Sequence, residues 1–276
     1  MKRLESIFVS MEKDFYPQRI VCLTEETTEL IYLLGEEDRI VGISGFTVRP
    51  VQARKEKPKV SAFTNANIQK VIDLKPDLVI GFSDIQADIA KKLIKKGITV
   101  WVNNHRSVED IFKMMIQLGS LLGKQEDAKK LVDQYIERID EIKGIVSKWE
   151  KKPKIYFEEW YDPLISGIQW VSEIITLGGG IDVFDELSKE SLAKNRIIEK
   201  HKEVIKRNPD IILASWCGKK FKKKKMLARK GWESIKAIEE DQVFEINSSI
   251  ILQPGPASVS EGLEIIFAIV KQWQEK

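Results

Sequence analysis

A ten-residue segment that occurs twice constrains this chain more than any other feature. Val71–Ile80 reads VIDLKPDLVI and Val204–Leu213 reads VIKRNPDIIL, an offset of 133 residues. In each copy a helical pattern stops before a proline, which cannot continue a helix, and an aspartate leads into a short apolar run typical of a buried strand. A second pair of segments, Glu29–Gly35 and Glu173–Gly179, places a helix end before a glycine in each half. The repeats predict two related lobes.

The order of the apolar runs predicts that both lobes are α/β. Short β-branched runs alternate with amphipathic stretches, which is typical of parallel sheets with crossover helices. In the first half we expect strands at residues 19–24, 39–44, 77–82 and 99–104. In the second half we expect strands at 154–159, 210–216 and 242–247, and helices at 170–177, 199–207 and 257–273.

A long helical stripe lies between the two halves. Residues 125–149 contain no proline and only one glycine, and their apolar residues recur with helical spacing. A helix of this length spans about 37 Å, enough to act as one rigid backbone for two lobes. We therefore predict two parallel-sheet α/β lobes, residues 1–122 and 151–276, joined by one long backbone helix at 123–150, with a ligand cleft between the lobes. An ordinary long surface helix inside one domain is the alternative.

Charge and hydropathy exclude several classes of partner. The 45 lysine and arginine residues nearly balance the 42 aspartate and glutamate residues, so the net charge of +3 gives no long-range field for nucleic acid or an anionic membrane. We interpret the lysine-rich run 219–225 as a solvated surface, with a nucleic-acid interaction module as the alternative. No apolar run approaches about 18 residues, and the start of the chain carries no signal-peptide pattern. We expect a monomer without a nucleic-acid partner.

The loops after the predicted strands carry the candidate ligand-binding residues. In open parallel sheets, ligands bind beyond the carboxyl ends of the strands. Aromatic side chains there offer contact area at little entropy cost, which suits a large, flat or partly apolar ligand. Arginine and lysine suit carboxylates or phosphates, and Glu25 or Gln253 can accept hydrogen bonds from amides. The candidates are Glu25, Phe46, Arg49, Phe63, Phe82, Trp160, Trp170, Arg196, Trp216, Lys219 and Gln253.

Catalytic signatures are sparse. His105 and His201 are the only histidines, and no zinc-protease, nucleophile-elbow, Walker or dinucleotide motif occurs. We therefore predict a binding protein without catalytic residues, intrinsic cofactor or protein metal site. The alternative is a cytoplasmic enzyme of the same fold in which Cys217, Glu159 and Arg49 meet across the cleft. For Trp170, two roles stay equally open: the side chain anchors its own helix, or it contacts the ligand.

Several segments together resemble the substrate-binding proteins of ABC importers whose lobes are joined by a helical backbone, the cobalamin-binding and siderophore-binding type. They lie between Pro17 and Trp273 and are Arg19–Thr24 followed by Thr28–Leu30, the strand starts at Asp77 and Asp210, Ser166–Gly167 and Pro254–Pro256. The resemblance implies a rigid clamp that captures cobalamin, a haem-like ring, a siderophore chelate or a metal ion and passes it to an ABC permease. In the cobalamin branch it also implies ligand-facing aromatics at Phe46 and Phe63.

Three features depart from this family. Its members are exported, which implies an extracytoplasmic location, whereas we expect a cytoplasmic one if Met1 is native. The resemblance implies one docking glutamate on each lobe, but Gln69 and Lys202 occupy those positions unless Glu203 takes the role. The loop at 216–221 also differs from the family pattern. Both uptake and intracellular carriage therefore stay open.

Overall fold

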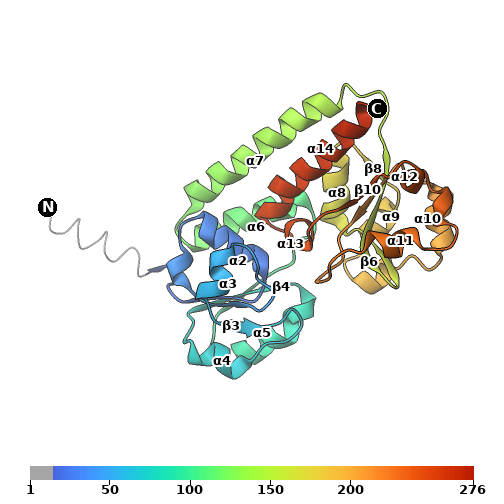
Figure 1. Ribbon diagram of the computed structural model, residues 1–276. Helices are drawn as coiled ribbons and strands as arrows, with labels where there is room; N and C mark the ends of the chain where they lie inside the picture. The colour runs from blue at the N-terminus through green and yellow to red at the C-terminus, as the bar shows by residue number, and fades with distance from the viewer. Residues whose placement is uncertain (1–14) are drawn as a thin grey trace. The chain divides into compact units, whose positions relative to one another are not determined.

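The computed structural model describes residues 15–276, which form two compact units (Figure 1). Residues 1–14, to which the expectation about a signal peptide refers, lie outside the described residues. The first unit contains the described residues up to His105 together with Glu109–Asp133, and the second contains Arg106–Val108 together with Gln134–Lys276. Each unit has its own α/β layers, so the predicted two-lobed α/β fold is confirmed. Across residues 15–276, none of the helices combines the length and apolar content that crossing a membrane requires.

The first unit is built on a five-stranded sheet with the order β3-β2-β1-β4-β5, and every pairing is parallel. Strands β1 and β4 are buried along their full length, as expected for central strands covered by helices on both faces. The strands are β1 (Ile20–Cys22), β2 (Ile40–Ser44), β3 (Lys59–Ser61), β4 (Leu78–Phe82) and β5 (Val100–Asn103). The helices are α2 (Glu25–Leu33), η2 (Glu37–Arg39), α3 (Val51–Glu56), α4 (Ile68–Asp73), η3 (Asp84–Gln86), α5 (Ala87–Ile94) and all but the first residue of α6 (Val108–Leu121).

The second unit is built on a sheet with the order β10-β9-β6-β7, and β8 also pairs with β6. Its core joins residues of β6 and β9 to an aromatic group that includes Phe184, Trp216 and Trp232. The strands are β6 (Lys154–Tyr161), β7 (Leu164–Ser166), β8 (Ile181–Asp182), β9 (Ile211–Ala214) and β10 (Val243–Glu245). The helices are α8 (Gln169–Leu177), α9 (Asp185–Ser188), η4 (Ala193–Arg196), α10 (His201–Arg207), α11 (Lys223–Leu227), η5 (Trp232–Ser234), α12 (Lys236–Glu239), α13 (Ser248–Ile251), the π-helical turn η6 (Ser258–Gly262) and α14 (Leu263–Gln274).

The repeated segment adopts the same backbone in both units. Lys75 and Asn208, which precede the repeated prolines, have left-handed φ angles of 48° and 45°. The second pair of repeats behaves alike, since Gly35 and Gly179 follow α2 and α8 with φ of 70° and 95°. Glycine adopts this conformation without a steric penalty. The helix stops inferred from the sequence are therefore confirmed in both units.

The repeated aspartate fixes the start of a neighbouring strand. The Asp77 carboxylate accepts a hydrogen bond from the Arg19 N–H at 3.0 Å, immediately before β1. The Asp210 carboxylate accepts one from the Lys154 N–H at 2.8 Å, at the first residue of β6. Since β4 pairs with β1 and β9 pairs with β6, each aspartate ties the beginnings of two paired strands together. This shared bond explains why the Pro-Asp pair occurs twice.

One continuous helix, α7 (Gln125–Val146), contributes to both units, because the division between them falls at Asp133 and Gln134 (Figure 1). The predicted long helix between the two halves is therefore confirmed. The three-part division of the chain at residues 122/123 and 150/151 stays a prediction, as does the ligand cleft.

Three short strands go beyond the sequence prediction. β3, β7 and β8 have only two or three residues each, too few to show a periodic pattern. β7 pairs with β6 in the antiparallel direction, so it adds an antiparallel edge to a sheet that is otherwise parallel. The last helical segment also differs from the expected regular helix, because it starts with the π turn η6.

Candidate ligand-binding site

The strand ends of the first sheet gather candidates at one edge, because all its strands are parallel. Glu25 begins α2 shortly after β1, Phe46 follows β2, Phe63 follows β3, and Phe82 is the last residue of β4. Phe46 and Phe63 are 54% and 38% exposed, respectively, and present apolar surface. These two fit the expectation of aromatic residues on open loops.

Phe82 differs from that expectation. It is 4% exposed and packs edge-to-face against His105, with ring centroids 5.0 Å apart. Burial of the ring between the strand end and His105 makes it part of the core of the first unit. In the sequence Phe82 both ends a predicted buried strand and precedes a polar turn like the open-loop candidates, and the structure gives it the buried environment of the strand.

A buried glutamine that the sequence reasoning missed links three of these loops. The Gln86 side-chain amide donates to the carbonyl oxygens of Phe63 at 3.0 Å and Leu23 at 3.4 Å. Its Oε1 accepts from the N–H of Phe82 at 2.9 Å. The loops after β1, β3 and β4 are therefore held to one another by a single side chain. The only sequence signal is a polar residue in the turn after a buried strand.

Two adjacent carboxyl groups are buried at the start of α2. Burial raises the pKa of Glu25 to about 7 and the pKa of Glu26 to about 8. The Thr24 hydroxyl donates to Glu26 at 2.6 Å, which acts in the opposite direction on the pKa of Glu26, but burial dominates. Near neutral pH, a protonated Glu25 can donate as well as accept hydrogen bonds, which widens the role expected from the sequence.

Arg49 lies in the loop before α3 and is partly engaged within its own unit. Its Nε donates to the Glu29 carboxylate at 3.0 Å. An anionic ligand group at Arg49 would have to compete with this carboxylate.

In the second unit, four aromatic side chains form one cluster at the ends of β6 and β9. The ring centroids are 5.1 Å apart for Trp160 and Tyr161, 4.5 Å for Tyr161 and Trp216, and 5.1 Å for Trp216 and Phe221. Trp216 and Phe221 are buried, whereas Trp160 and Tyr161 are half-buried. The structure thus joins Trp160 and Trp216 through Tyr161, a strand-end residue that is not among the candidate ligand-binding residues. We call these four residues the aromatic cluster.

A buried network of hydrogen bonds and one ion pair contacts this cluster through Trp216. The Glu158 carboxylate is fully buried and accepts from Arg229 Nη1 at 2.5 Å and Nη2 at 2.9 Å. Trp216 Nε1 also donates to it at 2.9 Å, and the Tyr156 hydroxyl donates at 3.1 Å. The Glu158 carboxylate thus orients Trp216 and links it to Tyr156 and to the loop carrying Arg229. We call this the Glu158 network.

Arg196 is placed differently from the sequence expectation. It is 2% exposed, and its guanidinium donates to the Glu159 carboxylate at 2.6 Å and to the Ser166 carbonyl oxygen. The predicted contact with a ligand anion is therefore replaced by an internal ion pair. The same pair engages the carboxylate that the enzyme alternative assigned to catalysis.

The remaining candidates of the second unit divide between packing and exposure. Trp170 is buried in α8, and its Nε1 donates to the Ile251 carbonyl at 2.9 Å, so it anchors α8 to α13. Gln253 is half-buried in the turn after α13. Lys219 is exposed beside the aromatic cluster. Ligand contact by these three residues stays a prediction.

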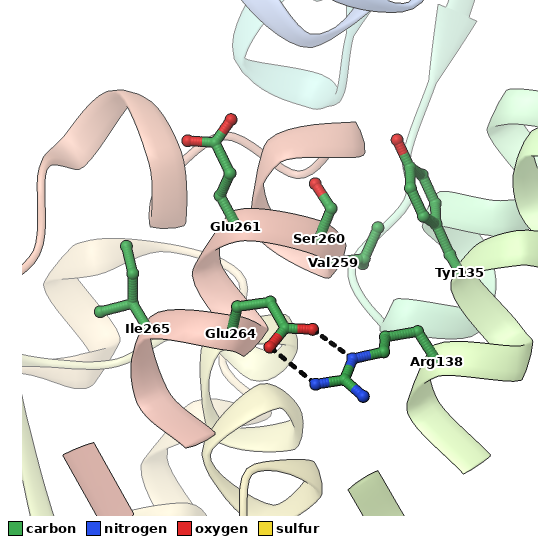
Figure 2. A pocket seen from close by; sticks show the side chains of 7 residues that line it. All are labelled: Tyr135, Arg138, Val259, Ser260, Glu261, Glu264 and Ile265. Atoms are coloured by element: carbon green, nitrogen blue, oxygen red, sulfur yellow. Dashed lines mark hydrogen bonds and ion pairs between the residues drawn. The ribbon is translucent and has the colours of Figure 1, made fainter. Parts of the chain in front are cut away.

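A cavity of about 480 Å³ lies elsewhere in the second unit, between α7 and the segment formed by η6 and α14 (Figure 2). Arg138 of α7 and Glu264 of α14 form a two-bond ion pair there, at 2.5 and 3.0 Å. The charge of Arg138 is thus already balanced, and no candidate residue contributes to the lining. The lining residues are Tyr135, Arg138, Val259, Ser260, Glu261, Glu264 and Ile265.

The described residues contain no metal centre, and the two expected docking positions carry no carboxylate, while Glu203 in α10 stays the alternative. Residues 15–276 contain no group of three or more His, Cys, Asp or Glu side chains that could hold a metal ion. At the expected docking positions, Gln69 is exposed on α4 and donates to Asp73 at 2.7 Å, and Lys202 is exposed on α10. A permease surface that recognises carboxylates would not find them at these two residues.

Comparison with known proteins agrees with this architecture. Residues 20–250 match the family model of periplasmic binding proteins. The uncharacterized ABC transporter substrate-binding lipoprotein YvrC of Bacillus subtilis is 30% identical over 271 residues, covering 93% of this chain and 80% of that protein. The chain therefore belongs to the periplasmic binding protein family, the substrate-binding proteins of ABC transporters. Proteins of this class bind a small-molecule ligand, work with a permease and are not enzymes.

Two solved structures share the fold. The periplasmic vitamin B12 binding protein BtuF of Vibrio cholerae has a TM-score of 0.76 and 21% identity, with 95% of this chain and 100% of that chain covered. A periplasmic heme binding protein from Pseudomonas aeruginosa has a TM-score of 0.79 and 18% identity, with 92% of each chain covered. At these identities the likeness concerns the fold.

Proposed function

We propose that this chain captures a cobalamin-like corrinoid or another metal chelate through the aromatic residues at its strand ends. The bound chelate would serve ABC-type uptake or carriage within the cell. The observation that carries the proposal is the set of accessible aromatic rings at the carboxyl ends of parallel strands in both units: Phe46, Phe63, Trp160 and Tyr161.

The chemistry of these rings supports a flat, conjugated ligand. Aromatic side chains offer large contact areas with few rotatable bonds, so little conformational entropy is lost when a ligand covers them. Phe46 and Phe63 are more than one-third exposed, so part of their apolar surface faces water. A bound ligand would cover this surface and remove the unfavourable contact with water. Relatives with this fold whose names specify vitamin B12 or heme fit the same class of cargo.

A thermal-shift screen tests the proposal. The purified chain is heated with cobalamin, cobinamide, haem, ferric siderophores and divalent metal ions, each at several concentrations. A ligand present at about 100 times its Kd stabilises a protein by about 2.7 kcal/mol, which a melting curve detects readily. We expect a saturable rise in Tm with at least one chelate and none with the free metal ions.

A matched pair of variants locates the effect. Trp160→Ala should raise the ligand concentration that is needed for a given rise in Tm, because the ring lies in the accessible part of the aromatic cluster. Trp273→Ala is the control, since Trp273 is also half-buried but lies in α14 at the end of the chain. Absence of a shift with every chelate would overturn the proposed function, and equal effects of both variants would overturn its placement.

A further inference from the structure

Two lysine ammonium groups lie on the aromatic cluster. Lys219 Nζ is 4.8 Å from the Trp160 ring centroid and 5.4 Å from the Tyr161 ring centroid, and it donates to the Tyr161 hydroxyl at 3.3 Å. Lys225 Nζ is 4.6 Å from the Tyr161 ring centroid. The negative face of an aromatic ring attracts a cation at such distances. Both ammonium groups are therefore held beside the accessible rings.

The carboxylates at the end of β6 do not balance these two charges. Glu158 is paired with Arg229 at 2.5 Å, and Glu159 is paired with Arg196 at 2.6 Å. Among the residues that the structure describes, no carboxylate oxygen lies within 4.0 Å of the ammonium group of Lys219 or Lys225. The accessible part of the cluster therefore carries two positive charges without a counter-ion from the described protein.

The segment that carries both lysines is anchored at its middle. Phe221 is buried against Trp216, and its N–H donates to the Glu245 carboxylate at 3.1 Å. Lys223 is held by Asp241 at 2.6 Å. The backbone N–H of Lys219 also donates to the Trp216 carbonyl at 3.0 Å, and that of Lys225 donates to the Lys222 carbonyl at 2.8 Å, so less conformational entropy is lost when the two lysines meet a ligand.

We propose that Trp160, Tyr161, Lys219 and Lys225 form a recognition surface for anionic groups attached to a flat, conjugated ligand. This inference rests on the proposed function and names the class of chelate, one that carries carboxylates rather than a neutral fringe of amides. The rings supply contact area for the conjugated part. Each ammonium supplies charge-assisted hydrogen bonds, which are about twice as strong as neutral ones.

Pairs of ligands that differ only in peripheral charge test this surface. Iron protoporphyrin is compared with its dimethyl ester, and dicyanocobyrinic acid with dicyanocobinamide, by quenching of tryptophan fluorescence. We expect the carboxylate member of at least one pair to bind about tenfold more tightly. The preference should shrink as NaCl rises to about 0.5 M, because salt screens exposed charges.

Variants assign the preference to the two lysines. Lys219→Met with Lys225→Met should abolish the preference by weakening the carboxylate ligand about tenfold or more while changing the neutral ligand less than about twofold. Lys224→Met is the control, because Lys224 is exposed in the same run but has no ring contact with the described part of the chain. Lys219→Arg with Lys225→Arg should retain the preference, since the charge and its ring contacts can persist.

The outcomes separate this inference from the function on which it rests. Equal affinities within both ligand pairs, or an equal loss for both members in the double methionine variant, would overturn the anionic surface and leave chelate binding intact. Tighter binding of the neutral members would overturn it as well. If the unaltered chain binds none of the four ligands, both the proposed function and this inference fail.

Discussion

Removal of the Arg229 guanidinium takes away the one charged donor that residues 15–276 supply to the Glu158 network. Arg229→Met leaves the Glu158 carboxylate fully buried, with hydrogen bonds from Trp216 at 2.9 Å and Tyr156 at 3.1 Å but with no positive charge in the network. Breaking a buried ion pair on one side costs about 3–5 kcal/mol, because the remaining charge stays desolvated and uncompensated. We expect the free energy of unfolding to fall by about this amount.

Urea unfolding followed by circular dichroism measures the loss. In a protein of this size 1 kcal/mol corresponds to about 2–4 °C in Tm, so thermal melting should fall by about 10 °C. Adding Glu158→Gln to Arg229→Met should recover much of the stability, since glutamine keeps an accepting oxygen and removes the buried charge. Lys230→Met, at the next residue, is the control and should change stability by less than about 0.5 kcal/mol.

Two results would refute this reasoning. A loss below about 1 kcal/mol for Arg229→Met would mean that solvent reaches the Glu158 carboxylate at little cost once the guanidinium is removed. A double variant as unstable as the single one would mean that lost packing around Arg229, rather than the uncompensated charge, accounts for the effect.

Three further predictions concern stability. Asp77→Ala and Asp210→Ala each remove the acceptor at a strand start and should cost about 1–3 kcal/mol in urea unfolding; losses below about 0.5 kcal/mol for both would contradict the role given to the repeat. Burial raises the pKa of Glu26 from 4.5 to about 8, so its contribution to stability is full below about pH 4.5 and is lost as the pH rises to about 8. Glu26→Gln should therefore gain stability relative to the parent between pH 5 and pH 8, and a difference that does not change with pH, measured by urea unfolding at both values, would count against this. Gly144→Ala adds a methyl group that meets open space beyond the neighbouring backbone of α7, as far as residues 15–276 are concerned, and should stabilise α7 by about 0.5–1 kcal/mol, whereas Gly179→Ala, at φ of 95°, should destabilise by about 1–3 kcal/mol; thermal shifts of the same sign would contradict the pair.

The fold could be predicted because the residues that end its helices and begin its strands act locally. The left-handed residue, the proline and the aspartate of the repeat act over a few neighbouring positions, so Lys75 and Asn208 have nearly equal φ angles although they lie in different units. Buried apolar runs likewise identify β1, β4, β6 and β9 without any knowledge of their partners. β3, β7 and β8 do not appear as separate buried apolar runs in the sequence, and their positions depend on pairing with longer strands.

The site could be predicted only in part, because its organisation depends on contacts between distant residues. Gln86 reaches a carbonyl oxygen 63 positions away, and Arg229 reaches Glu158 across 71 positions. Arg196 was expected to face a ligand, but Glu159, 37 positions away, binds it instead. Residue type and strand-end position predicted which side chains to consider, while tertiary contacts decide which of them keep a free surface.

Hydrogen exchange measured by mass spectrometry, with and without the chelate that gives the largest thermal shift, tests most directly whether the strand ends bind the ligand. We predict slower exchange of the bound protein in peptides covering residues 45–49, 62–64, 160–162 and 216–219. Protection confined to α7, η6 and α14 around the cavity of Figure 2, with unchanged exchange at the strand ends, would contradict the account.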